Sequence, residues 1–197
     1  MTDFDALHPD AVKWNGRYQE EGDKWQESRP RKLLLDFADQ LPTTGLALDA
    51  ASGVGVHGLF LAERGWHVIG LDISEVGLRL ARDVAMEKGL KMETAVLDLS
   101  ENPWLPANTF DVILNFRFLE RGTFPVYRQA LKPGGWLLFE TFILPNRIVT
   151  DPDYFLDPGE LQAAFSDLEV IHSAQIETVG QRSGKQKWVE QLVAMRQ

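Results

Sequence analysis

The sequence has no cysteine, which excludes disulfide bonds, thiol catalysis and metal sites with cysteine ligands. It also has no apolar run of the length that a membrane-spanning helix needs. The polar N-terminus does not show the basic and then apolar layout of a signal peptide. These absences predict a cytoplasmic protein without a membrane partner.

Positive charge is scarce, with 20 lysine and arginine residues against 29 acidic ones and a formal net charge of −9. Nonspecific binding to nucleic acid needs a positive surface, so we expect no nucleic-acid partner. The length of 197 residues suits one domain, with a core over 43–197 and an N-terminal helical extension or lid over 1–42. We expect a monomer or a homodimer.

An apolar strand that runs into a glycine-rich turn is the most informative segment. The strand covers residues 46–51, and the turn that follows has the spacing G-x-G-x-x-G, at Gly53, Gly55 and Gly58. A second apolar strand ends at Asp72, where a dinucleotide site has its ribose-binding acid. Taken alone, this pattern favours NAD.

The acid Asp49 stands directly before this turn and changes the choice of cofactor. A carboxylate beside a doubly charged pyrophosphate is repelled by about 1 kcal/mol per charge pair even in water. S-adenosylmethionine (SAM) has no phosphate, and its ammonium group would be attracted to Asp49 while its ribose suits Asp72. SAM therefore fits both acids, whereas NAD fits one.

Apolar periodicity and the positions of proline and glycine predict strands that alternate with helices. We expect strands over residues 46–51, 67–72, 92–97, 110–115 and 136–142, and helices over 30–41, 56–64, 74–88, 125–131 and from 157 onward. The segment between the third and fourth strands is too short and too rich in proline for a helix. Residues 1–28 are polar and irregular, and residues 143–156 form a long loop. The last two apolar segments, 168–176 and 188–195, predict an antiparallel hairpin.

Five motifs in this order resemble the class I SAM-dependent methyltransferases. They are Asp-x-x-x-Gly-x-Gly at 49–55, Asp72, Leu97-Asp98-Leu99, Phe110–Ile113 and Leu131–Gly135. The resemblance covers residue 46 to the C-terminus and implies an α/β, Rossmann-like fold. Its mostly parallel sheet of seven strands has the order 3-2-1-4-5-7-6, with an antiparallel C-terminal hairpin and helices on both faces. Segments 119–121, 140–142 and 155–161 are similar to a small bacterial subfamily loosely grouped with tellurite-resistance methyltransferases.

Further residues are expected to bind SAM. The resemblance implies that Asp98, with the Leu99 backbone, lies near the adenine; capping of a loop is the alternative for Asp98. The position of Asn115 at the carboxyl end of the fourth strand puts it beside the methionine portion, with a surface turn as the alternative. Tyr18 would cover the sulfonium, which aromatic rings attract; packing onto the sheet is the alternative for Tyr18, Trp14 and Trp25. Ala51 replaces the first glycine of the family's usual loop, so backbone access to the SAM tail is tighter. The expected SAM-binding residues are Asp49, Ala51, Ser52, Gly53, Gly55, Asp72, Ile73, Asp98, Leu99, Asn115 and Tyr18.

Substrates of such sheets bind beyond the carboxyl ends of the fourth and fifth strands. The polar residues there are Arg117, Glu120, Arg121, Glu140, Asn146, Arg147 and Tyr154. Arg117 and Arg121 could hold an anionic group, and Glu140 could orient an amine or accept a proton. A solvated rim of ion pairs is the alternative for each residue. His57 is expected to be a neutral polar contact, and no cluster has the spacing of metal ligands.

We therefore expect a SAM-dependent methyltransferase that acts on a small molecule by in-line methyl transfer. An RNA methyltransferase is the second hypothesis, with a basic patch made of Arg29, Arg31, Lys32, Arg182, Lys185 and Lys187. The negative net charge and the lack of an added binding domain disfavour it. A non-catalytic SAM-binding protein is the third hypothesis, and an NAD-dependent reductase the fourth.

Overall fold

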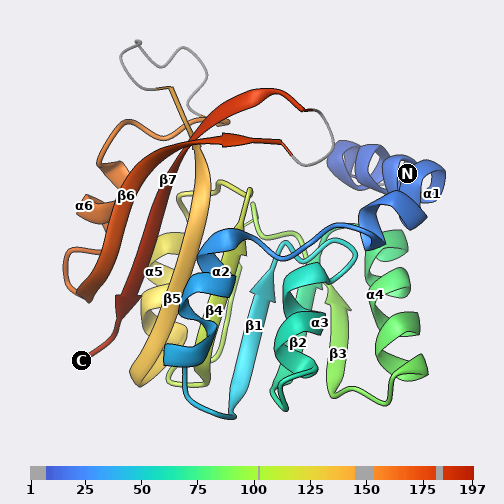
Figure 1. The fold of residues 1–197 in the computed structure, drawn as a ribbon, viewed down its shortest axis with the longest axis horizontal. Helices are drawn as coiled ribbons and strands as arrows, with labels where there is room; N and C mark the ends of the chain where they lie inside the picture. The colour runs from blue at the N-terminus through green and yellow to red at the C-terminus, as the bar shows by residue number, and fades with distance from the viewer. Residues whose placement is uncertain (1–7, 102, 145–152, 181–183) are drawn as a thin grey trace, which may run out of the picture.

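A single sheet of seven strands organises the protein, in the order β3-β2-β1-β4-β5-β7-β6 (Figure 1). The computed structural model describes residues 8–101, 103–144, 153–180 and 184–197. The five parallel strands are β1 (Leu46–Ala50), β2 (His67–Asp72), β3 (Met92–Val96), β4 (Phe110–Phe116) and β5 (Leu131–Ile143). The last two strands, β6 (Glu169–Val179) and β7 (Gln186–Met195), form an antiparallel hairpin, and β7 pairs with β5. The predicted sheet order and hairpin are confirmed.

Helices cover both faces of the sheet (Figure 1). One face carries α2 (Lys32–Phe37) with the 3-10 turn Ala38–Gln40, α3 (Val56–Ala62) and α4 (Glu75–Glu87). The other face carries α5 (Thr123–Ala130) and α6 (Glu160–Ala164). Strand side chains alternate between the faces, so that Ala47 and Val112 pack with the first group while Leu48 and Ile113 pack with the second.

Two local signals explain why the elements lie where they do. Ser74 begins α4 because its Oγ accepts a hydrogen bond from Gly77 N at 3.1 Å, as an N-cap residue should. The described residues between β3 and β4 contain no helix, as the proline-rich connection predicts. Within the described residues, no helix is long and apolar enough to span a membrane.

The N-terminal segment differs most from the prediction. The segment expected to be irregular contains an 18-residue helix, α1 (Pro9–Gln26), with a kink at Glu21. Trp14, Tyr18 and Trp25 are four and seven residues apart, a spacing that puts them on one side of a helix. These three aromatic side chains contact one another, which gives the helix its apolar side.

Several boundaries also differ. Strand β5 starts at Leu131, five residues before its expected start, because the chain pairs with Phe110 before a register shift at the Pro-Gly-Gly segment. Helix α5 begins at Thr123, so that Pro125 lies in its first turn. Helix α6 begins at Glu160, and the left-handed Gly159 precedes it. Most of the loop expected over 143–156 lies outside the described residues.

Candidate functional site

The glycine turn after β1 has a left-handed backbone at three positions. Gly53 and Gly55 have φ values of 55° and 76°, and Ala51 has a φ of 51°. The turn therefore has the glycine-like geometry that the motif predicts, including at the position where alanine stands. A Cβ atom at Gly53 would collide with the hydroxyl of Tyr18. Only glycine permits this close approach of α1.

Two carboxylates lie buried beneath this turn. Asp49 is 1% exposed, and its Oδ2 accepts a hydrogen bond from Gly58 N at 2.8 Å. Asp72 is 7% exposed and accepts hydrogen bonds from Gly53 N and Ser74 N, both at 2.8 Å. Among the described residues, neither acid forms an ion pair with a basic side chain.

The missing countercharge affects the protonation of both acids. Burial raises the pKa of Asp49 to about 7, although the Gly58 N–H lowers it, and the negative charge of Asp72 raises it further. Burial also raises the pKa of Asp72, against hydrogen bonds from three backbone N–H groups that lower it. A cation bound here would favour the ionised form of both carboxylates.

Helix α1 lies across this turn and over the start of α4 (Figure 1). Tyr18 packs against Gly53 and Gly77 and is 8% exposed. Asn15 Oδ1 accepts hydrogen bonds from Ser74 Oγ at 2.7 Å and from Val76 N at 3.2 Å. These contacts place an aromatic ring directly over the glycine turn, an arrangement that both the lid hypothesis and the packing alternative predict.

The other residues expected to bind SAM surround the same edge of the sheet. Asp98 follows β3, and its Oδ1 accepts hydrogen bonds from Ser100 N at 2.8 Å and Ser100 Oγ at 2.6 Å. His8, beside the start of α1, lies 3.8 Å from the other oxygen of Asp98. Leu99 is buried, and Ile73 is half-buried after Asp72. The Ser52 Oγ is buried without a hydrogen-bond partner in the described structure.

The side chain of Asn115, at the end of β4, makes two hydrogen bonds within the protein. Its Nδ2 donates to Phe118 O at 2.8 Å, and its Oδ1 accepts from Tyr127 Oη at 3.1 Å. The amide therefore fixes the loop that follows β4, at the border between the two halves of the sheet.

Arg117 and Glu140 lie together beyond β4 and β5. Arg117 Nη2 is 2.9 Å from Glu140 Oε1, while Gln191 Nε2 donates to Glu140 Oε2 at 2.6 Å. The backbone of Arg117 is left-handed, with a φ of 66°, and its N donates to Glu140 O at 2.7 Å. Glu140 is thus held by a cation and an amide, an arrangement that suits positioning of Arg117 better than proton abstraction.

The remaining residues expected on the substrate side have other contacts. Arg121 binds Glu160, with Nη2 2.8 Å from Oε2, and so fastens α6 instead of joining Arg117 around one anion. Glu120 Oε1 accepts from Gly122 N at 2.9 Å near the start of α5. Tyr154 is exposed and accepts a hydrogen bond from Lys13 Nζ at 3.4 Å. Asn146 and Arg147 lie outside the described residues.

Sequence reasoning missed Arg31 as a site residue and placed it on a surface patch. In the structure Arg31 is half-buried near Glu140, and this burial lowers the Arg31 pKa. His57 stacks on Phe116, with ring centroids 4.3 Å apart, and its Nε2 is buried without a hydrogen-bond partner in the described structure. Burial and then the charges of Arg31 and Arg117 lower the pKa of His57 to about 3, so His57 is neutral.

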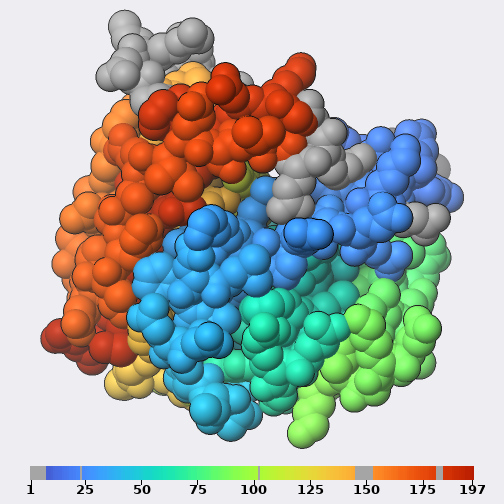
Figure 2. All heavy atoms as spheres, in the orientation of Figure 1, coloured from blue at the N-terminus to red at the C-terminus, as the bar shows by residue number. Residues whose placement is uncertain are grey.

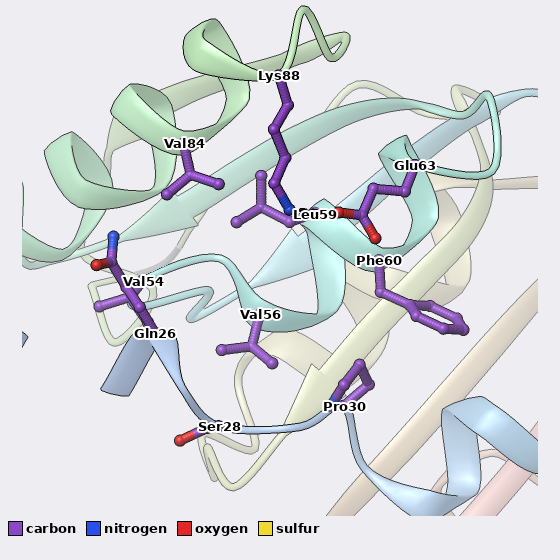
Figure 3. Close-up of a pocket in the computed structure, with 10 residues that line it drawn as sticks. All are labelled: Gln26, Ser28, Pro30, Val54, Val56, Leu59, Phe60, Glu63, Val84 and Lys88. Atoms are coloured by element: carbon purple, nitrogen blue, oxygen red, sulfur yellow. Dashed lines mark hydrogen bonds and ion pairs between the residues drawn. The ribbon is translucent and has the colours of Figure 1, made fainter. Parts of the chain in front are cut away.

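A separate pocket of about 200 Å³ lies on the outer side of α3 and α4 (Figure 3). Its wall is mostly aliphatic, with the ion pair of Lys88 and Glu63 at one side. It contains neither of the buried acids, so it is not the candidate site. In the described part of the chain, no group of three histidine, aspartate or glutamate residues could hold a metal ion.

Comparison with known proteins agrees with this geometry. Residues 47–135 match the family described as "Methyltransferase domain". The chain is 29% identical to a probable thiol methyltransferase 2 of Arabidopsis thaliana, over 88% of this chain and 81% of that protein. It is 32% identical to a ubiquinone biosynthesis O-methyltransferase of Bordetella avium, over 48% of this chain and 41% of that protein. The chain spans less than half the length of the first curated relatives it matches.

The crystal structure of TehB from Haemophilus influenzae has the same fold, with a TM-score of 0.78. It shares 16% identity and covers 92% of this chain and 67% of that chain. The family match, the sheet order and the acid-flanked glycine turn all indicate a methyltransferase domain. Residues 47–135 are those of a methyltransferase domain, and the chain has the fold of the class I SAM-dependent methyltransferases. The TehB likeness also agrees loosely, at the level of the fold, with the tellurite-resistance grouping.

The cofactor of this methyltransferase is S-adenosylmethionine. The described residues fit that cofactor, because buried Asp49 lacks the countercation that the SAM ammonium group would supply, and Asp72 would accept hydrogen bonds from the SAM ribose. They do not fit a pyrophosphate, which would lie against Asp49. The buried and unpartnered Ser52 Oγ adds a polar group to the same turn.

Proposed function

We propose that the protein transfers the methyl group of SAM to a small-molecule acceptor. The observation that carries this proposal is Asp49, a buried carboxylate with a raised pKa and no basic partner among the described residues. The SAM ammonium group supplies the missing cation. Asp72 then accepts from the ribose hydroxyls, and Tyr18 covers the sulfonium region, where an aromatic face stabilises positive charge.

The chemical step is an in-line displacement at the methyl carbon. A lone pair of the acceptor forms the new bond to carbon, the bond from carbon to sulfur breaks, and its electron pair stays on sulfur. Positioning of the two reactants supplies much of the catalysis in such a reaction. Since Glu140 is held by Arg117 and Gln191, we propose that it positions Arg117 and that the acceptor reacts in a nucleophilic protonation state.

The names of the relatives support a small acceptor, because they include an O-methyltransferase of ubiquinone biosynthesis and a probable thiol methyltransferase. The basic patch expected for RNA is divided in the structure. Arg31 is half-buried near Glu140, whereas Lys32 is exposed and pairs with Asp36 at 2.6 Å. Arg182 lies outside the described residues. These positions disfavour an RNA acceptor.

Calorimetry with SAM, S-adenosylhomocysteine and NADH tests the cofactor site. We expect both sulfur cofactors to bind, Asp49→Ala to abolish binding and Asp72→Ala to weaken it. Unaltered affinity in both variants, or preferred binding of NADH, would refute the site assignment. Methyl transfer from labelled SAM to a panel of oxygen, sulfur and nitrogen acceptors then tests catalysis. Tight SAM binding without transfer to any acceptor would favour the non-catalytic alternative.

A further inference from the structure

Two arginines interact with one carboxylate at the edge of the sheet beyond β4, β5 and β7, and a lysine contacts the same aromatic ring as one of them. We name Arg31, Arg117 and Lys187 the cationic cluster. Arg117 pairs with Glu140 at 2.9 Å, and Arg31 interacts electrostatically with the same carboxylate. Burial and the charges of Arg117 and Arg31 lower the pKa of Lys187. In a chain with a net charge of −9, such a local excess of positive charge indicates a site for an anion.

The Arg117 guanidinium is held in place but only partly used. Its Nη2 binds Glu140, while Nε and Nη1 are buried without a hydrogen-bond partner in the described structure. A buried donor without a partner is unfavourable, as is the left-handed backbone of a residue other than glycine. Both costs occur at the same residue, at the carboxyl end of a strand where ligands of such sheets bind. The Nε and Nη1 donors of Arg117 therefore lack a partner in the described structure that a ligand would have to displace.

Phe142 fixes the geometry of the cluster. The Arg117 Cζ lies 4.7 Å from the Phe142 ring centroid, and the Lys187 Nζ lies 4.8 Å from it. Cations are attracted to the face of an aromatic ring, so one ring contacts two side chains of like charge. Their mutual repulsion is relieved when an anion binds between or beside them.

The cationic cluster adjoins the proposed SAM site. His57 stacks on Phe116, which directly precedes Arg117 in the chain. Gly58, which directly follows His57, donates its N–H to Asp49. Figure 2 shows a hollow between the C-terminal hairpin, in orange and red, and the N-terminal segment, in blue, with gold atoms of the β5 colour inside it. The carboxyl end of β5 lies at this edge of the sheet (Figure 1).

We propose that the cationic cluster binds a carboxylate or similar oxyanion of the methyl acceptor, so that the substrate is an anionic small molecule. This inference rests on the proposed methyltransferase function and narrows its substrate class. Arg117 supplies the hydrogen-bond donors, while Arg31 and Lys187 add charge. Glu140 and Gln191 act as positioning residues for Arg117.

The test measures binding to the protein saturated with S-adenosylhomocysteine. Calorimetry compares benzoate with benzamide and acetate with acetamide, since each pair differs in charge and hardly in shape. We expect the carboxylates to bind at least about 10-fold more tightly than the amides, because charge-assisted hydrogen bonds are roughly twice as strong as neutral ones. Arg31→Gln and Arg117→Gln should reduce that preference, while the exposed neighbour substitution Lys32→Gln should leave it within about 2-fold.

The substitution Arg117→Gln leaves the buried carboxylate of Glu140 without its basic partner, which destabilises the fold. The double variant Arg117→Gln with Glu140→Gln removes both charges and keeps the shape of the pair, and Arg31→Gln leaves the pair intact. If S-adenosylhomocysteine does not bind the wild type, the proposed function fails. If it binds but no carboxylate is preferred over its amide, or if Lys32→Gln removes the preference as strongly as Arg31→Gln, the inference about the acceptor is overturned.

Discussion

Asp49→Asn should increase the stability of the protein without cofactor and decrease its affinity for SAM. The substitution keeps the shape of the side chain and an oxygen that can accept the hydrogen bond from Gly58 N, which is 2.8 Å from Oδ2. It removes only the ability to carry a negative charge. The two effects have opposite signs because the buried negative charge destabilises the protein without cofactor and attracts the ammonium group of SAM.

The stability change follows from the pKa. The Asp49 pKa is about 7 in the folded protein against an ordinary value of 3.8 for this side chain, so the folded state binds more protons than the unfolded state between these pH values. The free energy of unfolding therefore falls as the pH rises from about 4 to about 7. At about 1.4 kcal/mol per pKa unit, the ionised acid costs on the order of 4 kcal/mol at pH 8. The new amide N–H₂ costs about 1–2 kcal/mol when its partner is poor, which leaves a net gain of about 2–3 kcal/mol.

The affinity for SAM should change in the other direction. Removing one partner of a buried ion pair costs about 2–5 kcal/mol, equivalent to roughly 30-fold or more in the dissociation constant. Because SAM binds the ionised acid, the wild-type affinity should rise about 10-fold per pH unit below 7 and level off above it. The variant should lose that contribution to the pH dependence.

Urea denaturation at pH 5 and pH 8 measures the stability, and calorimetry over the same range measures the affinity. We expect the variant to be more stable than the wild type at pH 8 and nearly equal to it at pH 5, and to bind SAM weakly at both. A variant that is less stable at pH 8 would show that the carboxylate stabilises the fold. The burial argument would then be wrong.

Three further substitutions test particular contacts. Ala51→Gly should raise the free energy of unfolding by about 0.5–1 kcal/mol in urea, because glycine relieves the left-handed backbone; a decrease would contradict the φ value. Tyr127→Phe should lower it by about 1–2 kcal/mol, since Asn115 Oδ1 loses its buried donor, and a neutral result would show that this bond is not formed. Arg121→Gln should cost about 0.5–1 kcal/mol through the partly exposed pair with Glu160, while a loss of S-adenosylhomocysteine binding would put Arg121 in the site.

The sequence was sufficient for the part of the site that lies within one β-α-β unit. Asp49, the glycine turn and Asp72 are joined by a short stretch of chain, so their spacing predicts their geometry. The sheet order came from the resemblance, and the hairpin from the last two apolar segments. Helix α1 was missed because its aromatic residues are surrounded by charged ones, so the sequence shows no clear helical periodicity. The surface on which these aromatic residues pack, formed by α4 and the glycine turn, comes from a later part of the chain.

The cationic cluster could not be predicted because its members are far apart in the chain. Arg31, Arg117 and Lys187 meet only because β4 pairs with β5, and β5 with β7 in a register that sets Phe142 opposite Val189. The spacing of Arg117 and Arg121 suggested one binding group. In the structure Arg117 directly follows β4 and pairs with Glu140, whereas Arg121 pairs with Glu160 of α6.

Binding of S-adenosylhomocysteine and of 5′-methylthioadenosine to the wild type and to Asp49→Asn tests the central claim most directly. The second ligand lacks the amino acid and therefore the ammonium group. We predict that the wild type prefers S-adenosylhomocysteine by roughly 30-fold or more and that Asp49→Asn loses most of this preference. An undiminished preference in the variant would show that Asp49 does not bind the cationic end of the cofactor.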